Sequence, residues 1–423
     1  MAILKSRRWP QAFSSLASHD FRWFTVSQLA STTANWMEVI VRSLIIYNLS
    51  GSAVVIGAVN VSRTFPSLVC GFIGGVLADR WDRRTLLTAS QLAHGCSAAA
   101  LGFLVLTDSI RIWHFVVAAI IEGIMGSLQQ PARQALIPAV VPREHLMNAI
   151  ALSGGIWNAS RTIGPTLAGG AAAVAGPSAA LFLEAALYFG AAVATRRISP
   201  MTRSPGTSPH EGSSHRPRSG EKRKNDFLED FRGYRYLWEN RIVGWLAILA
   251  IVPVLFAAGH RILAPVFAKE VLDMGAGGVG LLLAAPGIGA IAAVFIVAVS
   301  GTVHHKGLLS LAGVMVHGLA IVVYALSDRL WISLTALIVH GFAMTAYRSL
   351  NQTLIQLNTP DEYMGRVMAV HAADRSLHPL TGLAVALLAD LWGVQAAVAA
   401  SGAGCAIVAL IVAFKSRVIR HLD

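Results

Sequence analysis

Several ionisable side chains lie inside long apolar runs, and they are the residues of this chain that could do chemistry. A charge is costly to bury in an apolar medium, so each must pair with a neighbour or take part in function. The candidates for a pathway through the protein are Glu38, Arg42, Arg63, Glu122, His340, Asp374 and Arg375. Burial disfavours the charged form of a carboxyl group, which lets it exchange protons near neutral pH. A proton carried by Glu38 or Glu122 is therefore one hypothesis, and ion pairs that only hold helices together are the alternative.

A second group of charges forms a short connector between two apolar runs. Residues 75–84 read G-V-L-A-D-R-W-D-R-R. Gly75 permits close contact between helices, and Asp79 can pair with Arg83 or with Arg133. Contacts that form in one state and break in another would make the connector a latch, whereas a signal for membrane orientation needs only the arginines. The residues assigned to this gating motif are Gly75, Asp79, Arg80, Arg83, Arg84 and Arg133.

The composition is that of a polytopic membrane protein. Hydrophobic residues make up 55% of the 423-residue chain and charged residues 13%, whereas soluble domains carry about 25% charged residues. Basic loops on one side of a membrane explain the net charge of +12, so we expect no nucleic-acid partner. Cys70, Cys96 and Cys405 lie in apolar runs without the spacing of a zinc site, so we expect neither a bound metal nor a disulfide.

Twelve apolar segments are long enough to span a bilayer, which requires roughly 20 residues per helix. They lie near 21–47, 53–78, 85–107, 112–137, 147–175, 178–195, 241–266, 278–299, 307–326, 330–355, 364–391 and 394–414. Lysine and arginine are concentrated in one set of connectors, which includes both termini, whereas the other set holds only Arg111, Lys269 and Arg329. The basic side is expected to face the cytoplasm. Both termini should therefore lie inside the cell, with the chain in the inner or plasma membrane.

A polar segment divides the chain into two halves. Residues 196–240 are rich in Pro, Ser, Gly and basic residues, and their later part has the pattern of an amphipathic helix at a membrane surface. A hinge between rigid bundles is the main interpretation, and a docking tail is the alternative. The pattern Q-x-L-I-x4-P-x-E occurs from residue 134 and again from residue 352, as expected of an internal repeat. The expected organisation is an N-terminal six-helix bundle at 1–195, a basic linker at 196–240 and a C-terminal six-helix bundle at 241–423.

The connector resembles the signature of the major facilitator superfamily, G-x-L-A-D-R-x-G-R-R, with Asp82 in place of a Gly. F-R-W-F-T-V-S-Q-L-A-S at 21–31, P-A-R-Q-A-L-I-P at 131–138 and P-D-E-Y-M-G-R-V-M at 360–368 are similar to the branch of enterobactin-type siderophore exporters and macrolide efflux pumps. The resemblance implies an all-α membrane protein with twelve transmembrane helices in two pseudo-symmetric six-helix bundles. It also implies transport by alternating access, without enzymatic activity and without a cofactor.

A second motif bears on whether transport is export or uptake. R-T-I-G-P-T-L-A-G-G at 161–170 resembles the antiporter motif of the superfamily, G-P-x-x-G-G, with one extra residue between the two pairs. The residues concerned are Gly164, Pro165, Gly169 and Gly170. The resemblance implies export rather than uptake. An ordinary packing face of small residues is the alternative.

The resemblance also ranks the ionisable residues. In the superfamily fold the first, fourth, seventh and tenth helices line the central cavity, which favours Glu38, Glu122 and His340. Glu184 falls in a peripheral helix and is expected to be structural. The resulting prediction is a monomeric transporter that exports a small hydrophobic or amphipathic molecule by proton antiport, as in multidrug-type efflux. A dedicated siderophore or natural-product exporter, a lysophospholipid transporter and a non-transporting membrane scaffold are the alternatives.

Overall fold

The fold is known from a computed structural model. It describes residues 11–80, 82–199, 240–257, 259–299, 305–360, 363, 367, 374–420 and 422. All the regular elements among these residues are helices. The linker between 200 and 239 therefore lies outside the described residues, as do the side chains of Gly75, Asp79, Arg80, Asp374 and Arg375.

The N-terminal half consists of two short 3-10 helices and five long α-helices joined by short connections. The elements are η1 (Gln11–Ala17), α1 (His19–Ser50), α2 (Ala53–Arg80), α3 (Arg83–Leu106), α4 (Ile112–Val140), η2 (Arg143–His145) and α5 (Leu146–Arg196). The bounds of α1 to α4 agree within a few residues with those expected from the apolar runs. The two spans expected at 147–175 and 178–195 are the two arms of α5. They are separated at Gly176, whose positive φ of 85° breaks the helix next to Pro177.

The C-terminal half repeats this arrangement with one strongly divided span. The elements are α7 (Arg241–Ala257), α8 (Gly259–Ile262), α9 (Ala264–Glu270), α10 (Ala276–Val299), α11 (Lys306–Leu326), α12 (Leu330–Asn358), α14 (Asp374–Trp392), α15 (Val394–Lys415) and α16 (Arg417–Arg420). The span expected at 241–266 is built from α7, α8 and α9 in succession. With the two arms of α5, each of the twelve expected spans contains a described helix, and of the span expected at 364–391 the structure describes the later part, α14.

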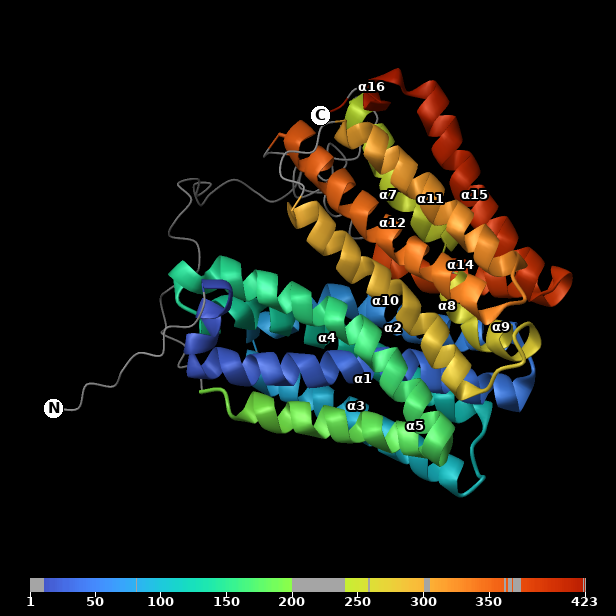
Figure 1. Cartoon of the computed structure of the whole chain (residues 1–423). Coiled ribbons are helices and arrows are strands. Elements are labelled where there is room, and N and C mark those ends of the chain that lie inside the picture. The colour runs from blue at the N-terminus through green and yellow to red at the C-terminus, as the bar shows by residue number, and fades with distance from the viewer. Residues whose placement is uncertain are drawn as a thin grey trace, which may run out of the picture.

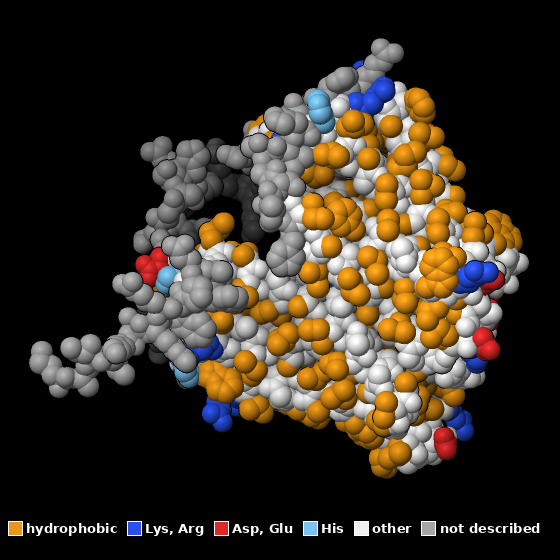
Figure 2. Space-filling view, viewed as in Figure 1, with side chains coloured by type: hydrophobic (Ala, Val, Ile, Leu, Met, Phe, Trp, Pro, Cys, Tyr) orange, Lys and Arg blue, Asp and Glu red, His pale blue; other side chains and the backbone are white. Residues whose placement is uncertain are grey.

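The outer surface fits a lipid environment. Figure 2 shows hydrophobic side chains spread over the visible face, with charged side chains towards its edges. Large apolar side chains such as Val174, Leu106 and Phe414 are 90%, 63% and 72% exposed. A soluble protein rarely exposes apolar side chains over so wide an area. Eight of the described helices are long and apolar enough to cross a membrane by length and composition alone, and α1, which carries Glu38 and Arg42, is not among them.

The two bundles meet at one end and diverge towards the other, where α16 lies (Figure 1). At the closed end α5 packs on α10 and α2 packs on α14. A Cβ atom on Gly169 would lie 2.7 Å from the Cα of Gly280, so these two backbones touch. The hydroxyl of Ser52 donates a 3.0 Å hydrogen bond to Asp390 across the same end, and the hydroxyl of Tyr47 donates to Glu270.

Candidate functional site

The centre of the N-terminal bundle holds a buried ion pair between α1 and α4. Both terminal nitrogens of Arg42 donate to the carboxylate of Glu122, one of them over 2.6 Å. This two-pronged contact is the strongest arrangement that a guanidinium and a carboxylate can form. Glu122 is fully buried and Arg42 nearly so. Two of the expected pathway residues are therefore brought together as a fixed pair.

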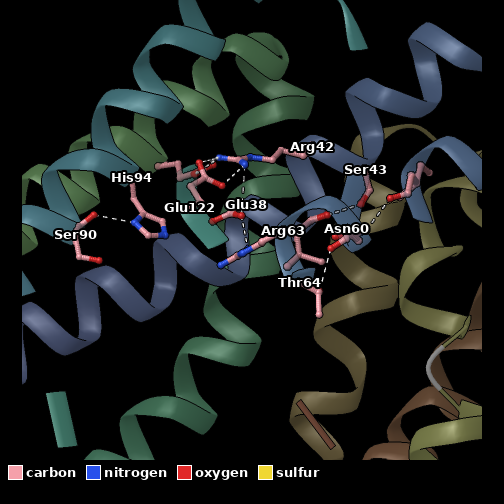
Figure 3. Close-up of polar contacts among 12 residues, drawn as sticks. Glu38, Arg42, Ser43, Asn60, Arg63, Thr64, Ser90, His94 and Glu122 are labelled. Atoms are coloured by element: carbon pink, nitrogen blue, oxygen red, sulfur yellow. Dashed lines mark hydrogen bonds and ion pairs between the residues drawn. The ribbon is translucent and has the colours of Figure 1, made fainter. Parts of the chain in front are cut away.

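Further charges extend this pair into a network (Figure 3). Arg63 of α2 donates a 2.5 Å hydrogen bond to Glu38 of α1, and Glu38 lies 3.5 Å from Arg42. Glu184, on the second arm of α5, lies 3.6 Å from Arg42. The network thus draws residues from α1, α2, α4 and α5. It contains four of the expected pathway residues and one, Glu184, that the sequence analysis had set aside.

The network contains three carboxyl groups and two guanidinium groups. A proton on one carboxyl group would balance these charges, and an unbalanced charge in a dry interior is strongly destabilising. Neither carboxyl oxygen of Glu184 has a hydrogen-bond partner among the described residues, and the side chain is fully buried. His94 and Tyr188 pack beside the network, with ring centroids 5.1 Å apart. Glu184 could have been recognised from the sequence, because a carboxyl group inside an apolar run needs a partner on whatever helix it occurs.

A large polar cavity lies beside this network, between the two bundles. Its volume is about 660 Å³, and residues of α1, α2, α4, α5, α8 and α12 line it. Five of the lining side chains are arginines, namely Arg63, Arg133, Arg161, Arg261 and Arg348. Arg161 and Arg348 are recognisable in the sequence as charges in apolar runs, but they and Arg261 were not among the predicted pathway residues. Their convergence depends on how separate helices pack.

Two tryptophans stand among these arginines. Trp36 and Trp157 pack edge to face with ring centroids 5.9 Å apart. The guanidinium carbon of Arg261 lies 4.5 Å from the centroid of the Trp36 ring, and that of Arg161 lies 5.9 Å from it. Arg161 belongs to the N-terminal bundle and Arg261 to the C-terminal bundle. Trp36 therefore marks a point where cationic groups of both bundles converge.

Two arginines of the segment 75–84 link the start of α3 to the ends of α4 and α5. Arg83 donates a 2.9 Å hydrogen bond to the carbonyl of Ala135 near the end of α4, and Arg84 donates a 2.5 Å bond to the carbonyl of Arg196 at the end of α5. Asp82, which departs from the family signature, is the N-cap of α3 and accepts a 3.0 Å bond from the amide of Thr85. Arg133 donates to the hydroxyls of Ser31 and Thr32, over 3.2 and 3.4 Å. The expected contacts of Asp79 lie outside the described side chains.

The antiporter-like motif is a packing surface on α5 that faces two helices. A Cβ atom on Gly164 would lie 2.5 Å from the Cβ of Trp36, so α5 packs closely on α1 there. Gly169 makes the contact with α10 at the closed end, where the carbonyl of Pro165 is also close to Gly280. Nothing lies within 4 Å of a Cβ atom on Gly170. One contact is thus inside the N-terminal bundle and one is between the bundles.

His340 belongs to a cluster of three buried histidines. Its ring stacks on that of His317 on α11, with centroids 4.3 Å apart, and meets that of His260 on α8 edge to face, with centroids 4.4 Å apart. In the part of the chain that the structure describes, no group of His, Cys, Asp and Glu side chains is arranged to hold a metal ion. The expected roles of Asp374 and Arg375 lie beyond the described side chains.

Comparisons with known proteins agree with this architecture. The sequence model of the Major Facilitator Superfamily matches residues 24–377. The chain is 22% identical to the staphyloferrin A transporter of Staphylococcus aureus over 94% of its length and 97% of that protein. It is 28% identical to the enterobactin exporter EntS of Salmonella typhi over 80% of its length and 78% of that protein.

Solved structures share the fold. A bacterial homolog of the human lysosomal transporter Spinster, in an inward-facing and unoccupied conformation, superimposes with a TM-score of 0.71 at 12% identity. The match covers 96% of this chain and 97% of that one. The nucleoside transporter NupG gives a TM-score of 0.67 at 12% identity, over 94% of this chain and 100% of that one.

Proposed function

This chain belongs to the Major Facilitator Superfamily, and from this premise we propose that it exports a small amphipathic molecule across the inner or plasma membrane by alternating access. A multi-pass membrane transporter, and not an enzyme, is what the family match describes. The observation that carries the proposal is the 660 Å³ cavity between two bundles whose backbones touch at one end, where Gly169 meets Gly280. A substrate that enters from the divergent end can leave when the contacts of α5 with α10 and of α2 with α14 open.

We propose proton antiport as the energy source. The three buried carboxyl groups of Glu38, Glu122 and Glu184 support it, because their charge exceeds that of Arg42 and Arg63. Two of them, Glu38 and Glu122, are the carboxyl groups that the sequence singles out. Glu122 belongs to the network and also lines the cavity. A change in its protonation would therefore change the charge next to a bound substrate.

Two kinds of substrate remain, and one is favoured. A multidrug-type pump takes many hydrophobic molecules, whereas a dedicated exporter takes one natural product. The relatives named for staphyloferrin A and enterobactin favour the dedicated siderophore-type exporter. The polar lining of the cavity favours it too, because a purely hydrophobic molecule would leave buried polar groups without partners.

The orientation and organisation follow from the same reasoning. We propose that the divergent end and both termini face the cytoplasm, because the basic connectors lie there. The functional unit is a monomer with bundles at 1–195 and 241–423, joined by the linker at 196–240. In this arrangement Arg83 and Arg84 tie the ends of α4 and α5 together at the cytoplasmic surface.

The test is transport into everted membrane vesicles that contain the protein. An imposed pH gradient should drive accumulation of a siderophore such as enterobactin, and Glu38→Gln and Glu122→Gln should each lower the gradient-driven rate about 10-fold or more, as loss of a proton-transfer group does. Glu144→Gln is the control, because that side chain is 76% exposed. Rates are normalised to the amount of folded protein. Coupling that is unchanged in both Glu38→Gln and Glu122→Gln would exclude proton antiport through this pair.

A further inference from the structure

We propose that the central cavity binds a small polyanion, with the guanidinium groups of Arg161, Arg261 and Arg348 as its main anchors. This assignment rests on the proposed function and narrows its substrate. The ligand is a molecule that presents several anionic oxygens, such as carboxylates or phenolates, within one compact frame. A lipophilic cation is the class that it excludes.

The charge of the lining is the first reason. Five arginines face the cavity, and Glu122 is the one carboxylate among the described residues that line it. Both oxygens of Glu122 already accept hydrogen bonds from Arg42. Even with Arg63 paired to Glu38, guanidinium groups outnumber carboxylates among the described side chains of the cavity wall. A planar guanidinium matches the two oxygens of a carboxylate, so this wall suits an anion with several such groups.

The position of the three anchors is the second reason. Arg161 projects from α5 in one bundle, while Arg261 on α8 and Arg348 on α12 belong to the other. Arg161 and Arg261 face the same indole ring, that of Trp36. An anion held between them would contact both bundles at once. Such a ligand would distinguish the two states of the transporter, because the arginines separate when the bundles move.

The remainder of the lining supports the same chemistry. Amide side chains face the cavity from α1, α2, α4 and α5, at Asn35, Asn60, Gln129, Gln130 and Asn158. These groups donate hydrogen bonds to anionic or carbonyl oxygens. Trp36 and Trp157 offer aromatic edges and faces to a flat part of the ligand. A cation in this space would meet like charge and would gain little from either tryptophan, since Arg261 already covers the Trp36 ring.

Binding of citrate to the purified full-length protein tests the assignment. Thermal unfolding and tryptophan fluorescence are followed as citrate is added at constant ionic strength, with rhodamine 6G as the cationic comparison. We expect saturable stabilisation by citrate and none by rhodamine 6G. Arg161→Gln and Arg261→Gln should each weaken the apparent Kd for citrate roughly 10-fold, as expected for loss of a charged hydrogen bond. Arg161→Lys should retain more of the binding, because it keeps the charge.

Arg329→Gln is the matched control, because Arg329 is exposed at the start of α12, outside the cavity lining. Citrate binding that is absent, or equally strong in Arg161→Gln, Arg261→Gln and Arg329→Gln, would overturn the assignment. Vesicle transport separates this result from the proposed function. Export of rhodamine 6G without citrate binding would leave an exporter with a different substrate class. Arginine-dependent citrate binding without outward transport of enterobactin or either probe would retain the anion site and reject export.

Discussion

The two bundles share one fold but hold opposite kinds of polar centre. The N-terminal bundle buries Glu38, Arg42, Arg63, Glu122 and Glu184 as a charged network. The C-terminal bundle buries a cluster of three histidine rings. Three arginines of the cavity, at 161, 261 and 348, also line a smaller space next to this cluster.

The difference between the charged network and the histidine rings indicates that the two bundles have different roles. An ion-pair network is worth keeping only where its geometry is fixed, because a charge that loses its partner in a dry interior is heavily penalised. Neutral rings can shift against one another at little cost, because their contacts are not directional to the same degree. We infer that the N-terminal bundle carries the protonation chemistry, while the C-terminal bundle supplies packing around the arginines that meet the substrate.

Of the substitutions that test this contrast between the bundles, replacement of Arg42 should have the largest effect on stability and transport. Arg42→Gln leaves Glu38, Glu122 and Glu184 with Arg63 as the remaining guanidinium of the network. The loss of one partner from a buried ion pair costs about 3–5 kcal/mol. Thermal unfolding of the purified protein should show this destabilisation, and transport should be lost. A variant as stable as the wild type would mean that the carboxyl groups of the network are already neutral.

Replacing Glu184 should have a smaller effect than replacing Glu122. Glu122→Gln breaks the two-pronged contact with Arg42 and should destabilise the protein by about 3 kcal/mol. Glu184→Gln removes the surplus carboxyl group, whose oxygens accept no hydrogen bond, and should change the unfolding free energy by less than about 1 kcal/mol. The two variants are compared in the same unfolding assay. Equal losses would show that Glu184 is an ionised partner of Arg42 and not the site of the balancing proton.

Replacing His340 should have the smallest effect. His340→Phe keeps an aromatic ring between His260 and His317 and removes two ring nitrogens that have no hydrogen-bond partner in the described part of the chain. A shape-conserving change of this kind costs less than about 1.5 kcal/mol. The dependence of vesicle transport on pH should keep its wild-type form. A shifted pH profile in His340→Phe would place protonation chemistry in the C-terminal bundle as well and would remove the contrast.

The helices could be predicted from the sequence because the membrane imposes a simple length rule. Apolar runs of about 20 residues mark spans wherever they occur. The spans expected at 85–107 and 307–326 correspond to the helices Arg83–Leu106 and Lys306–Leu326. Glu38, Arg42, Arg63 and Glu122 could be selected by the same reasoning, because charges in apolar runs stand out. The fold class followed from the connector at 75–84, whose signature is a local pattern.

The tertiary structure alone decided which of these residues act together. Glu184 was expected to be structural from its helix, and the turn at Gly176 brings the second arm of α5 back so that Glu184 lies beside Arg42. Asp82 looked like a departure from the family signature and proved to be the cap of α3. Arg161, Arg261 and Arg348 converge from two bundles. Apolar length and charge are properties of a local stretch of chain, so the sequence states them directly. A binding site is a property of distances between helices, and these depend on how all the helices pack.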